Sequence, residues 1–285
     1  MRSALLAAAI CALIAGSRLL PLSAQRTPPP AVAAGAGLPR LPDGHPDLQG
    51  LWLKSAGGFQ GLFIGSLDGT NFAAPGGGRG DGRGGRAGGG PPAAPRYEYT
   101  PEAEAERQDR LKRGYEDPEA RCHLPGVPRS LDQPGGLYPV QIIQDEKYVA
   151  LLHEAMHDVR IIPTDNSPHP KNYWAWDGDS RGRWDGDTFV VDVSNFNGRT
   201  WLDMAGNFVD ANEHVVERFR LIDRDTILYE ATVTDPTVFV KPIEFRFTLK
   251  RVPTDQQILE YSCLEGERSL QHYTDEDGGK KRRAK

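Results

Sequence analysis

The second half of the chain is a succession of short apolar runs separated by turn residues. The runs RGRW and TFVVDVS flank Asp185-Gly186-Asp187, an Asp-Gly pair that is typical of a tight hairpin. In PIEFRFTLKR, apolar and polar residues alternate, which is the period of a strand with one buried face. About eight such runs with short connections predict an antiparallel meander, and closing it into a barrel removes its exposed edges.

The first half of the chain contains fewer such runs and is expected to be long and irregular. It includes one short helix over 100–114, with Thr100 as N-cap, Pro101 at the first helical position and Gly114 as the stop. Gly50-Leu51-Trp52 opens the first apolar run, and a Gly-x-Trp also begins lipocalin-type barrels, where the Trp plugs one end. We therefore expect a mainly β, lipocalin-like barrel.

The chain begins with a basic residue, an apolar run and a small-residue exit over 1–24, which is the pattern of a signal peptide. A retained membrane anchor is the alternative, but the run is short for a membrane span. We expect an exported protein, periplasmic or extracellular, without stable membrane insertion after cleavage. The predicted parts are a flexible lead-in (25–44), one barrel domain (45–270) with a disordered Gly/Arg-rich insertion (73–95), and a basic tail (271–285).

The net charge and the cysteines narrow the possible partners and the compartment. The formal net charge is −5, and loss of Arg2 and Arg18 with the signal peptide makes it more negative, so no nucleic-acid partner is expected. Cleavage leaves Cys122 and Cys263. In an oxidising compartment they are expected to form a disulfide, worth roughly 4 to 5 kcal/mol in the chain-entropy model. Two buried free thiols are the alternative.

The string LLHEAMHDV (151–159) contains a literal His-Glu-x-x-His. On a helix this string provides two zinc ligands and the general base of many metalloproteases. The surrounding run of hairpins instead predicts strand and turn. Along one strand the two histidines would lie about 13 Å apart, too far to share a metal. We therefore expect no metal site and no cofactor, with at least one of the two histidines facing solvent and with His157 more important than His153.

Several segments resemble a large group of uncharacterised exported bacterial proteins that carry PDLxGxW, GRWEGDTLVVDTxGFN and TWLD motifs. The segments are HPDLQGLW (45–52), DPEARCHLPGVPR (117–129), GRWDGDTFVVDVSNFNGRTWLDMAG (182–206), HVVERF (214–219) and EYSC (260–263). The resemblance implies a lipocalin-like barrel and no established reaction. In this group the region of the His-Glu-x-x-His string often reads Tyr-Glu-x-x-His, so the resemblance carries over only Glu154 and His157.

The candidate catalytic residues are His157, Glu154 and Glu217. Glu217 falls on the same strand face as Val215 and Phe219, and a carboxylate on an apolar face often has a raised pKa suited to acid–base work. The alternative is a structural ion pair with Arg246 or with a neighbour of Arg218.

The candidate ligand-binding residues lie around a proline-rich turn and in the later strands, where a barrel mouth would place a basic group, an anion clamp and aromatic rings. They are Arg160, His169, Trp176, Asp192, Trp201 and Asp203. Ordinary packing is the alternative for the aromatic residues, and turn capping is the alternative for the aspartates.

These features favour an exported barrel that binds a small, partly aromatic or amphipathic ligand. The alternative is an acid–base enzyme, such as a hydrolase, lyase or isomerase, that uses His157 with Glu154 or Glu217 on such a ligand. A zinc hydrolase built on the His-Glu-x-x-His string ranks third. An isolated polar contact in an apolar pocket would favour binding, whereas a histidine and a carboxylate within hydrogen-bond distance would favour chemistry. The sequence does not identify a protein partner.

Overall fold

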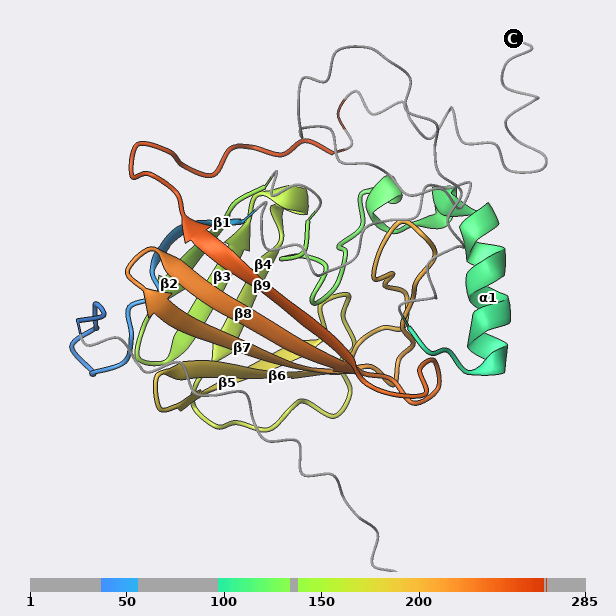
Figure 1. The fold of residues 1–285 in the computed structure, drawn as a ribbon, viewed down its shortest axis with the longest axis horizontal. Helices are drawn as coiled ribbons and strands as arrows, with labels where there is room; N and C mark the ends of the chain where they lie inside the picture. The colour runs from blue at the N-terminus through green and yellow to red at the C-terminus, as the bar shows by residue number, and fades with distance from the viewer. Residues whose placement is uncertain (1–36, 56–96, 134–137, 264, 266–285) are drawn as a thin grey trace, which may run out of the picture. The chain divides into compact units, whose positions relative to one another are not determined.

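The computed structural model describes residues 37–55, 97–133, 138–263 and 265 (Figure 1). The predicted signal peptide, Gly/Arg-rich insertion and basic tail lie outside the described residues, as does the lead-in up to residue 36. The strands are β1 (Gly50–Lys54), β2 (Val140–Gln144), β3 (Tyr148–His153), β4 (Val159–Pro163), β5 (Asp179–Asp185), β6 (Thr188–Ser194), β7 (His214–Asp223), β8 (Thr226–Thr234) and β9 (Ile243–Arg251). The helix α1 spans Pro101–Lys112, and short 3-10 turns span Gly114–Glu116, Glu119–Arg121 and Ala155–His157.

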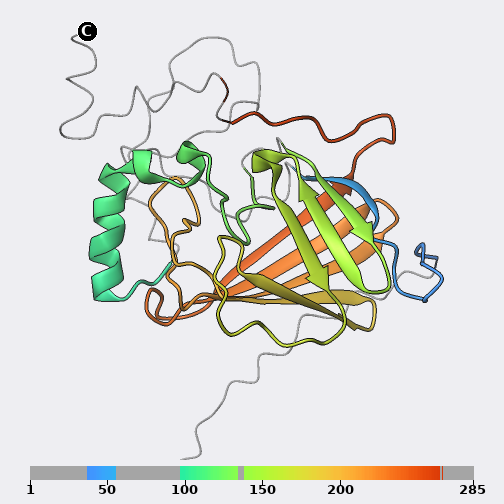
Figure 2. The ribbon, with the colours of Figure 1, turned by 180° about the vertical axis from the view of Figure 1, so that it is seen from behind.

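The nine strands form one antiparallel sheet in the order β4-β3-β2-β1-β9-β8-β7-β6-β5. The two outer strands, β4 and β5, come together and nearly close the barrel (Figure 2). At this seam Arg160 of β4 donates to the hydroxyl of Ser180 of β5 at 2.9 Å. A Cβ atom at Gly182 of β5 would lie 2.6 Å from the ring of Phe189 and 2.9 Å from a methyl group of Ile162 in β4. The seam therefore requires a residue without a side chain at position 182.

One end of the barrel, which we call the hairpin end, carries the short turns β2–β3, β5–β6 and β7–β8. Trp52 is fully buried, and its indole nitrogen donates to the carbonyl oxygen of Leu48 at 2.8 Å. The guanidinium of Arg251 lies 4.2 Å from the centre of the Trp52 ring. The tryptophan of the Gly-x-Trp motif is therefore buried and covered by this arginine.

The opposite end, which we call the loop end, carries the longer connections 195–213 and 235–242 and the segment 97–133 that contains α1 (Figure 1). The side-chain oxygen of Thr100 accepts from the backbone nitrogen of Ala103 at 3.3 Å, so this residue is the N-cap that the sequence predicts. The guanidinium of Arg110 packs 4.1 Å from the ring centre of Phe208 and binds α1 to the 195–213 connection.

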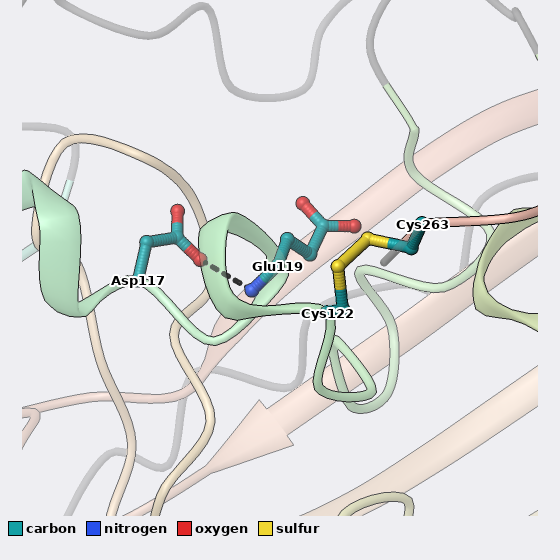
Figure 3. The surroundings of a disulfide bond; sticks show 4 residues. All are labelled: Asp117, Glu119, Cys122 and Cys263. Carbon is teal, nitrogen blue, oxygen red and sulfur yellow. Dashed lines mark hydrogen bonds between the residues drawn. A yellow bond between two sulfur atoms is a disulfide. The ribbon is translucent and has the colours of Figure 1, made fainter. Parts of the chain in front are cut away.

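Cys122 and Cys263 form a disulfide, with their Cα atoms 5.7 Å apart, as the sequence predicts (Figure 3). The bond joins the turn Glu119–Arg121 to the segment that follows β9. Asp117 accepts from the backbone nitrogen of Glu119 at 3.0 Å and caps this turn. Disulfides are typical of exported proteins, and none of the helices in the described ranges is long and apolar enough to cross a membrane.

The barrel interior follows the predicted alternation. In β9 the residues Ile243, Phe245, Phe247 and Leu249 are buried, whereas the intervening residues are exposed or half-buried. In β7 the same alternation buries Val215, Glu217, Phe219 and Leu221. The carboxylate of Glu217 therefore lies inside the barrel.

Candidate functional site

A group of buried polar side chains lies inside the barrel toward the loop end. We call it the inner polar cluster, and its members come from β3, β4, β5, β7 and β8 and from the connections that lead into β4 and β5. Removing such groups from water costs several kcal/mol unless they pair with one another. The members are His153, Asp158, Arg160, Asp177, Ser180, Glu217 and Tyr229.

The centre of the cluster is an ion pair between Arg160 and Glu217, which are 4% and 0% exposed. Arg160 donates to both carboxylate oxygens, at 2.6 and 3.2 Å. Tyr229 donates its hydroxyl hydrogen to Glu217 at 2.9 Å. This bidentate geometry satisfies the buried carboxylate and makes the pair strong. Glu217 therefore has a structural partner, which is Arg160 and not the predicted Arg246, since Arg246 lies outside and pairs with Glu230 at 3.4 Å.

His153 ends β3 and is 5% exposed. Burial lowers its pKa to about 4, an effect that the nearby Asp158 carboxylate only partly opposes, so the ring is neutral near neutral pH. Its Nε2 atom has no hydrogen-bond partner among the described residues. A hydrogen bond with the backbone of Ser130 raises this pKa only slightly. Nε2 lies 3.9 Å from Oδ2 of Asp158.

Asp158 and Asp177 are two buried carboxyl groups that interact with each other next to this ring. Burial raises the pKa of Asp177 well above its usual value, and the charge of Asp158 and the hydrogen bond between the two groups raise it further. Asp177 therefore holds its proton more tightly than an exposed aspartate does. Oδ2 of Asp158, Oδ1 of Asp177 and Nε of Arg160 have no hydrogen-bond partner among the described residues. With Nε2 of His153, the cluster has four open polar atoms.

A further carboxyl group, Glu213, lies close to the cluster, immediately before β7, and is 3% exposed. Burial raises its pKa well above the usual value, and the nearby carboxylates of Asp235 and Asp177 raise it further. The loop end of the barrel interior is therefore rich in acidic groups.

The segment LLHEAMHDV is strand and turn, as predicted. β3 ends at His153, and the turn Ala155–His157 contains left-handed backbone at Met156 (φ 60°) and His157 (φ 51°). The two histidines therefore do not share a helix face, which a zinc site of this type requires. Within the described ranges, no group of three or more His, Cys, Asp or Glu side chains is arranged to hold a metal ion.

The structure places the two histidines of this segment in different surroundings. His157 is exposed, and its Nε2 accepts from the backbone nitrogen of Tyr261 at 2.7 Å. Glu154 accepts from the backbone nitrogen of Leu259 at 2.9 Å. Both candidate catalytic residues therefore hold the segment that leads to the disulfide, whereas His153 points into the barrel. Glu217, the third candidate, is buried in the inner polar cluster and apart from them.

His169 and Asp192 lie together on the outer face of the barrel. His169 contacts Asp192 at 2.8 Å and Asp179 at 2.6 Å through its two ring nitrogens. His214 contacts the other oxygen of Asp192 at 3.0 Å. Burial raises the pKa of Asp192, but the hydrogen bonds from the two histidines lower it below its usual value. These contacts hold the 164–178 connection against β5, β6 and β7.

The remaining candidates have separate structural contacts. Trp176 stacks on His123, with ring centres 4.9 Å apart. Trp201 is 3% exposed, and its carbonyl oxygen accepts from Arg129 at 3.3 Å. Asp203 accepts from the backbone nitrogens of Ala205 at 2.8 Å and Asn207 at 3.3 Å, so it caps a turn, which was the alternative considered for it. Of the predicted ligand-binding residues, the structure brings only Arg160 into the inner polar cluster.

The sequence reasoning missed His153, Asp158 and Asp177. Strand alternation could have placed His153 inside, because it follows the buried Val149 and Leu151 on the same face of β3. Asp158 and Asp177 occupy turn positions, where aspartate usually caps the backbone. Their position inside the barrel depends on how the strands close, which no local pattern shows.

Two surface clefts lie at the hairpin end, away from this cluster. One is lined by Asp47, Arg224, Arg251 and neighbouring residues, and the other by residues 41–43 and 144–148. Arg251 has its guanidinium hydrogens engaged with Gln49, Arg224 and Asp225. Four buried polar atoms without a hydrogen-bond partner among the described residues lie in the inner polar cluster, and we take them as the stronger indication of a binding site.

Comparison of the chain with protein-family models, with curated proteins and with solved structures found no significant match.

Proposed function

We propose that this protein is an exported β-barrel module that binds a small, amphipathic or partly aromatic ligand, with the polar group of the ligand held by the inner polar cluster. The observation that carries the proposal is the set of open polar atoms on His153, Asp158, Arg160 and Asp177, whose side chains are all at least nine-tenths buried. Buried polar atoms in native proteins almost always have a partner, and a ligand would supply it here.

The surroundings of the cluster suit an amphipathic ligand. The Tyr229 ring, whose hydroxyl belongs to the cluster, lies 5.0 Å from the ring of Phe219 and 4.7 Å from the ring of Phe247. A few placed polar groups beside aromatic side chains are the usual composition of a small-molecule site. The disulfide and the predicted signal peptide agree with an exported protein.

A thermal-shift screen of small amphipathic compounds against the purified protein tests this proposal. A ligand present at 100 times its Kd adds about 2.7 kcal/mol to the free energy of unfolding. The affinity of the ligand should fall at least tenfold in His153→Leu. The affinity should be unchanged in His214→Gln, a histidine variant on the outer face. A ligand that binds both variants as it binds the wild type would place the site elsewhere and refute the proposal.

Acid–base chemistry in the same cluster is the second candidate. The observation that favours it is the buried His153, whose pKa burial lowers to about 4 and whose Nε2 has no partner among the described residues, beside Asp177, whose pKa burial raises. His153 would then act as the base, in place of the predicted His157, and Asp177 as the acid. Incubating a ligand from the screen with the protein and following it by NMR tests this function, because recovery of the unchanged ligand after many hours would exclude it for that compound.

A further inference from the structure

We infer that the ligand group held by the inner polar cluster is an organic cation that carries N–H donors, such as an ammonium or amidinium group. This inference rests on the proposed function and names the chemical class of its ligand. The contacts would be made by Asp158 Oδ2, Asp177 Oδ1 and His153 Nε2.

The balance of donors and acceptors supports a donor-rich ligand. Of the four open atoms, the two carboxylate oxygens are acceptors, and Nε2 of His153 is an acceptor in the tautomer that carries the ring proton on Nδ1. Nε of Arg160 is the remaining atom and is a donor. An ammonium group has three N–H donors and no acceptor, and an amidinium group is also a pure donor, so either matches the acceptors of the cluster.

The charge balance points the same way. The positive charge of Arg160 is neutralised by Glu217, to which it donates two hydrogen bonds. Asp158 and Asp177 bring two more buried carboxyl groups into the cluster, and their negative charge is left over once Arg160 is paired with Glu217. That charge is costly inside a barrel unless a positive group lies beside it. A cationic ligand would supply this group, whereas an anionic ligand would add a second negative charge.

An anion has little to bind in this cluster. The terminal nitrogens of Arg160 are engaged with Glu217 and Ser180, and only Nε remains open. A carboxylate placed there would face the oxygens of Asp158 and Asp177 and the lone pair of His153. Recognition of a carboxylate typically uses the bidentate fork of an arginine, which this arginine does not have available.

Three probes of the same size and different charge test the inference: benzamidine, which is a cation at neutral pH, benzyl alcohol, which is neutral, and benzoate, which is an anion. Binding to the full chain is measured by titration calorimetry, and the site is identified from the ¹⁵N shift of His153 Nε2, which changes when that atom accepts a hydrogen bond. We expect benzamidine to bind at least tenfold more tightly than either other probe and to shift the His153 signal.

Two variants test the negative charge of the two carboxyl groups. Glu230→Gln removes a carboxylate that lies outside the cluster and pairs with Arg246, so this control should bind benzamidine within about threefold of the wild type. The double variant Asp158→Asn, Asp177→Asn removes the charge, and we expect its affinity to fall more than tenfold. Because this change removes buried charge without changing side-chain size, the double variant should fold, and its circular dichroism spectrum checks that it does.

The outcomes distinguish the inference from the proposed function. If benzyl alcohol or benzoate shifts the His153 signal and benzamidine does not, the cluster is a binding site but the cation inference is wrong. If none of the three probes binds at millimolar concentration, the cation inference is also overturned. In that case only a hit from the compound screen that depends on His153 would keep the proposed function.

Discussion

Glu217→Gln tests whether the Arg160–Glu217 pair holds the barrel interior together. The substitution keeps the size of the side chain but leaves the charge of Arg160 without its counter-ion. Arg160 and Glu217 are only 4% and 0% exposed. Breaking one partner of such a buried pair typically costs about 3–5 kcal/mol, because the remaining charge is desolvated and uncompensated. We expect a loss in that range in the free energy of unfolding, measured by urea denaturation with tryptophan fluorescence.

An exposed pair in the same sheet is the matched control. Arg246 and Glu230 are 3.4 Å apart, with side-chain exposures of 56% and 34%. Exposed ion pairs contribute about 0–1 kcal/mol, so Glu230→Gln should be nearly neutral. If Glu217→Gln costs no more than Glu230→Gln, the inner pair does not stabilise the barrel and the reasoning is refuted.

The double variant Arg160→Met, Glu217→Leu separates the cost of a lone buried charge from the value of the pair. Removing both charges removes the uncompensated charge, so the loss should be smaller than in Glu217→Gln. It should not reach zero, because the hydroxyl group of Tyr229 loses its acceptor at 2.9 Å. An unsatisfied buried hydroxyl group costs about 1–3 kcal/mol, and we expect the double variant to lie in that range.

Three further predictions follow from the pH dependence, the disulfide and the seam. The pKa of His153 is lowered to about 4 from 6.5, so the stability from its neutral form is present above pH 6.5 and is lost as the pH falls toward 4. This loss is on the order of 3 kcal/mol. The free energy of unfolding of His153→Gln, measured by urea denaturation, should not show this loss as the pH falls. Cys122→Ser with Cys263→Ser opens a loop of 141 residues and should lower stability by about 4–5 kcal/mol, while thiol titration of the denatured, unreduced wild type should find no thiol in this pair. Gly182→Ala would place its Cβ 2.6 Å from Phe189 and should cost about 1–3 kcal/mol through overpacking; a neutral thermal midpoint would show that the seam adapts.

Much of the fold follows from local patterns in the sequence. Alternation predicted the buried faces of β7 and β9, the Asp185-Gly186-Asp187 turn predicted the β5–β6 hairpin, and Thr100 and Pro101 predicted the start of α1. These features depend on residues that are close in the sequence, so single-sequence reasoning reaches them. The disulfide was also predicted, because two cysteines in a chain that is expected to be exported allow one intramolecular pairing.

The candidate site was harder to predict because its members meet across the barrel. Arg160 in β4 and Glu217 in β7 are far apart in the sequence and lie on strands that are not neighbours in the sheet. Their pairing depends on the closure of β4 onto β5, which is set by the whole sheet. The sequence indicated an unusual carboxylate at Glu217 but named the wrong partner, and it ranked His157 above His153 because a familiar motif drew attention to both.

The barrel does not need all of its buried polar side chains in order to fold. The Arg160–Glu217 pair with Tyr229 and Ser180 is self-contained, since its members largely satisfy one another. The Asp158–Asp177 pair and His153 add buried charge and open polar atoms to it, and apolar residues of similar size at these positions would be expected to stabilise a barrel whose only task was to fold. Proteins typically depart from such local consistency at functional sites. His153, Asp158 and Asp177, which add buried charge and open polar atoms to the fold, are therefore also the three residues that we propose to contact the ligand.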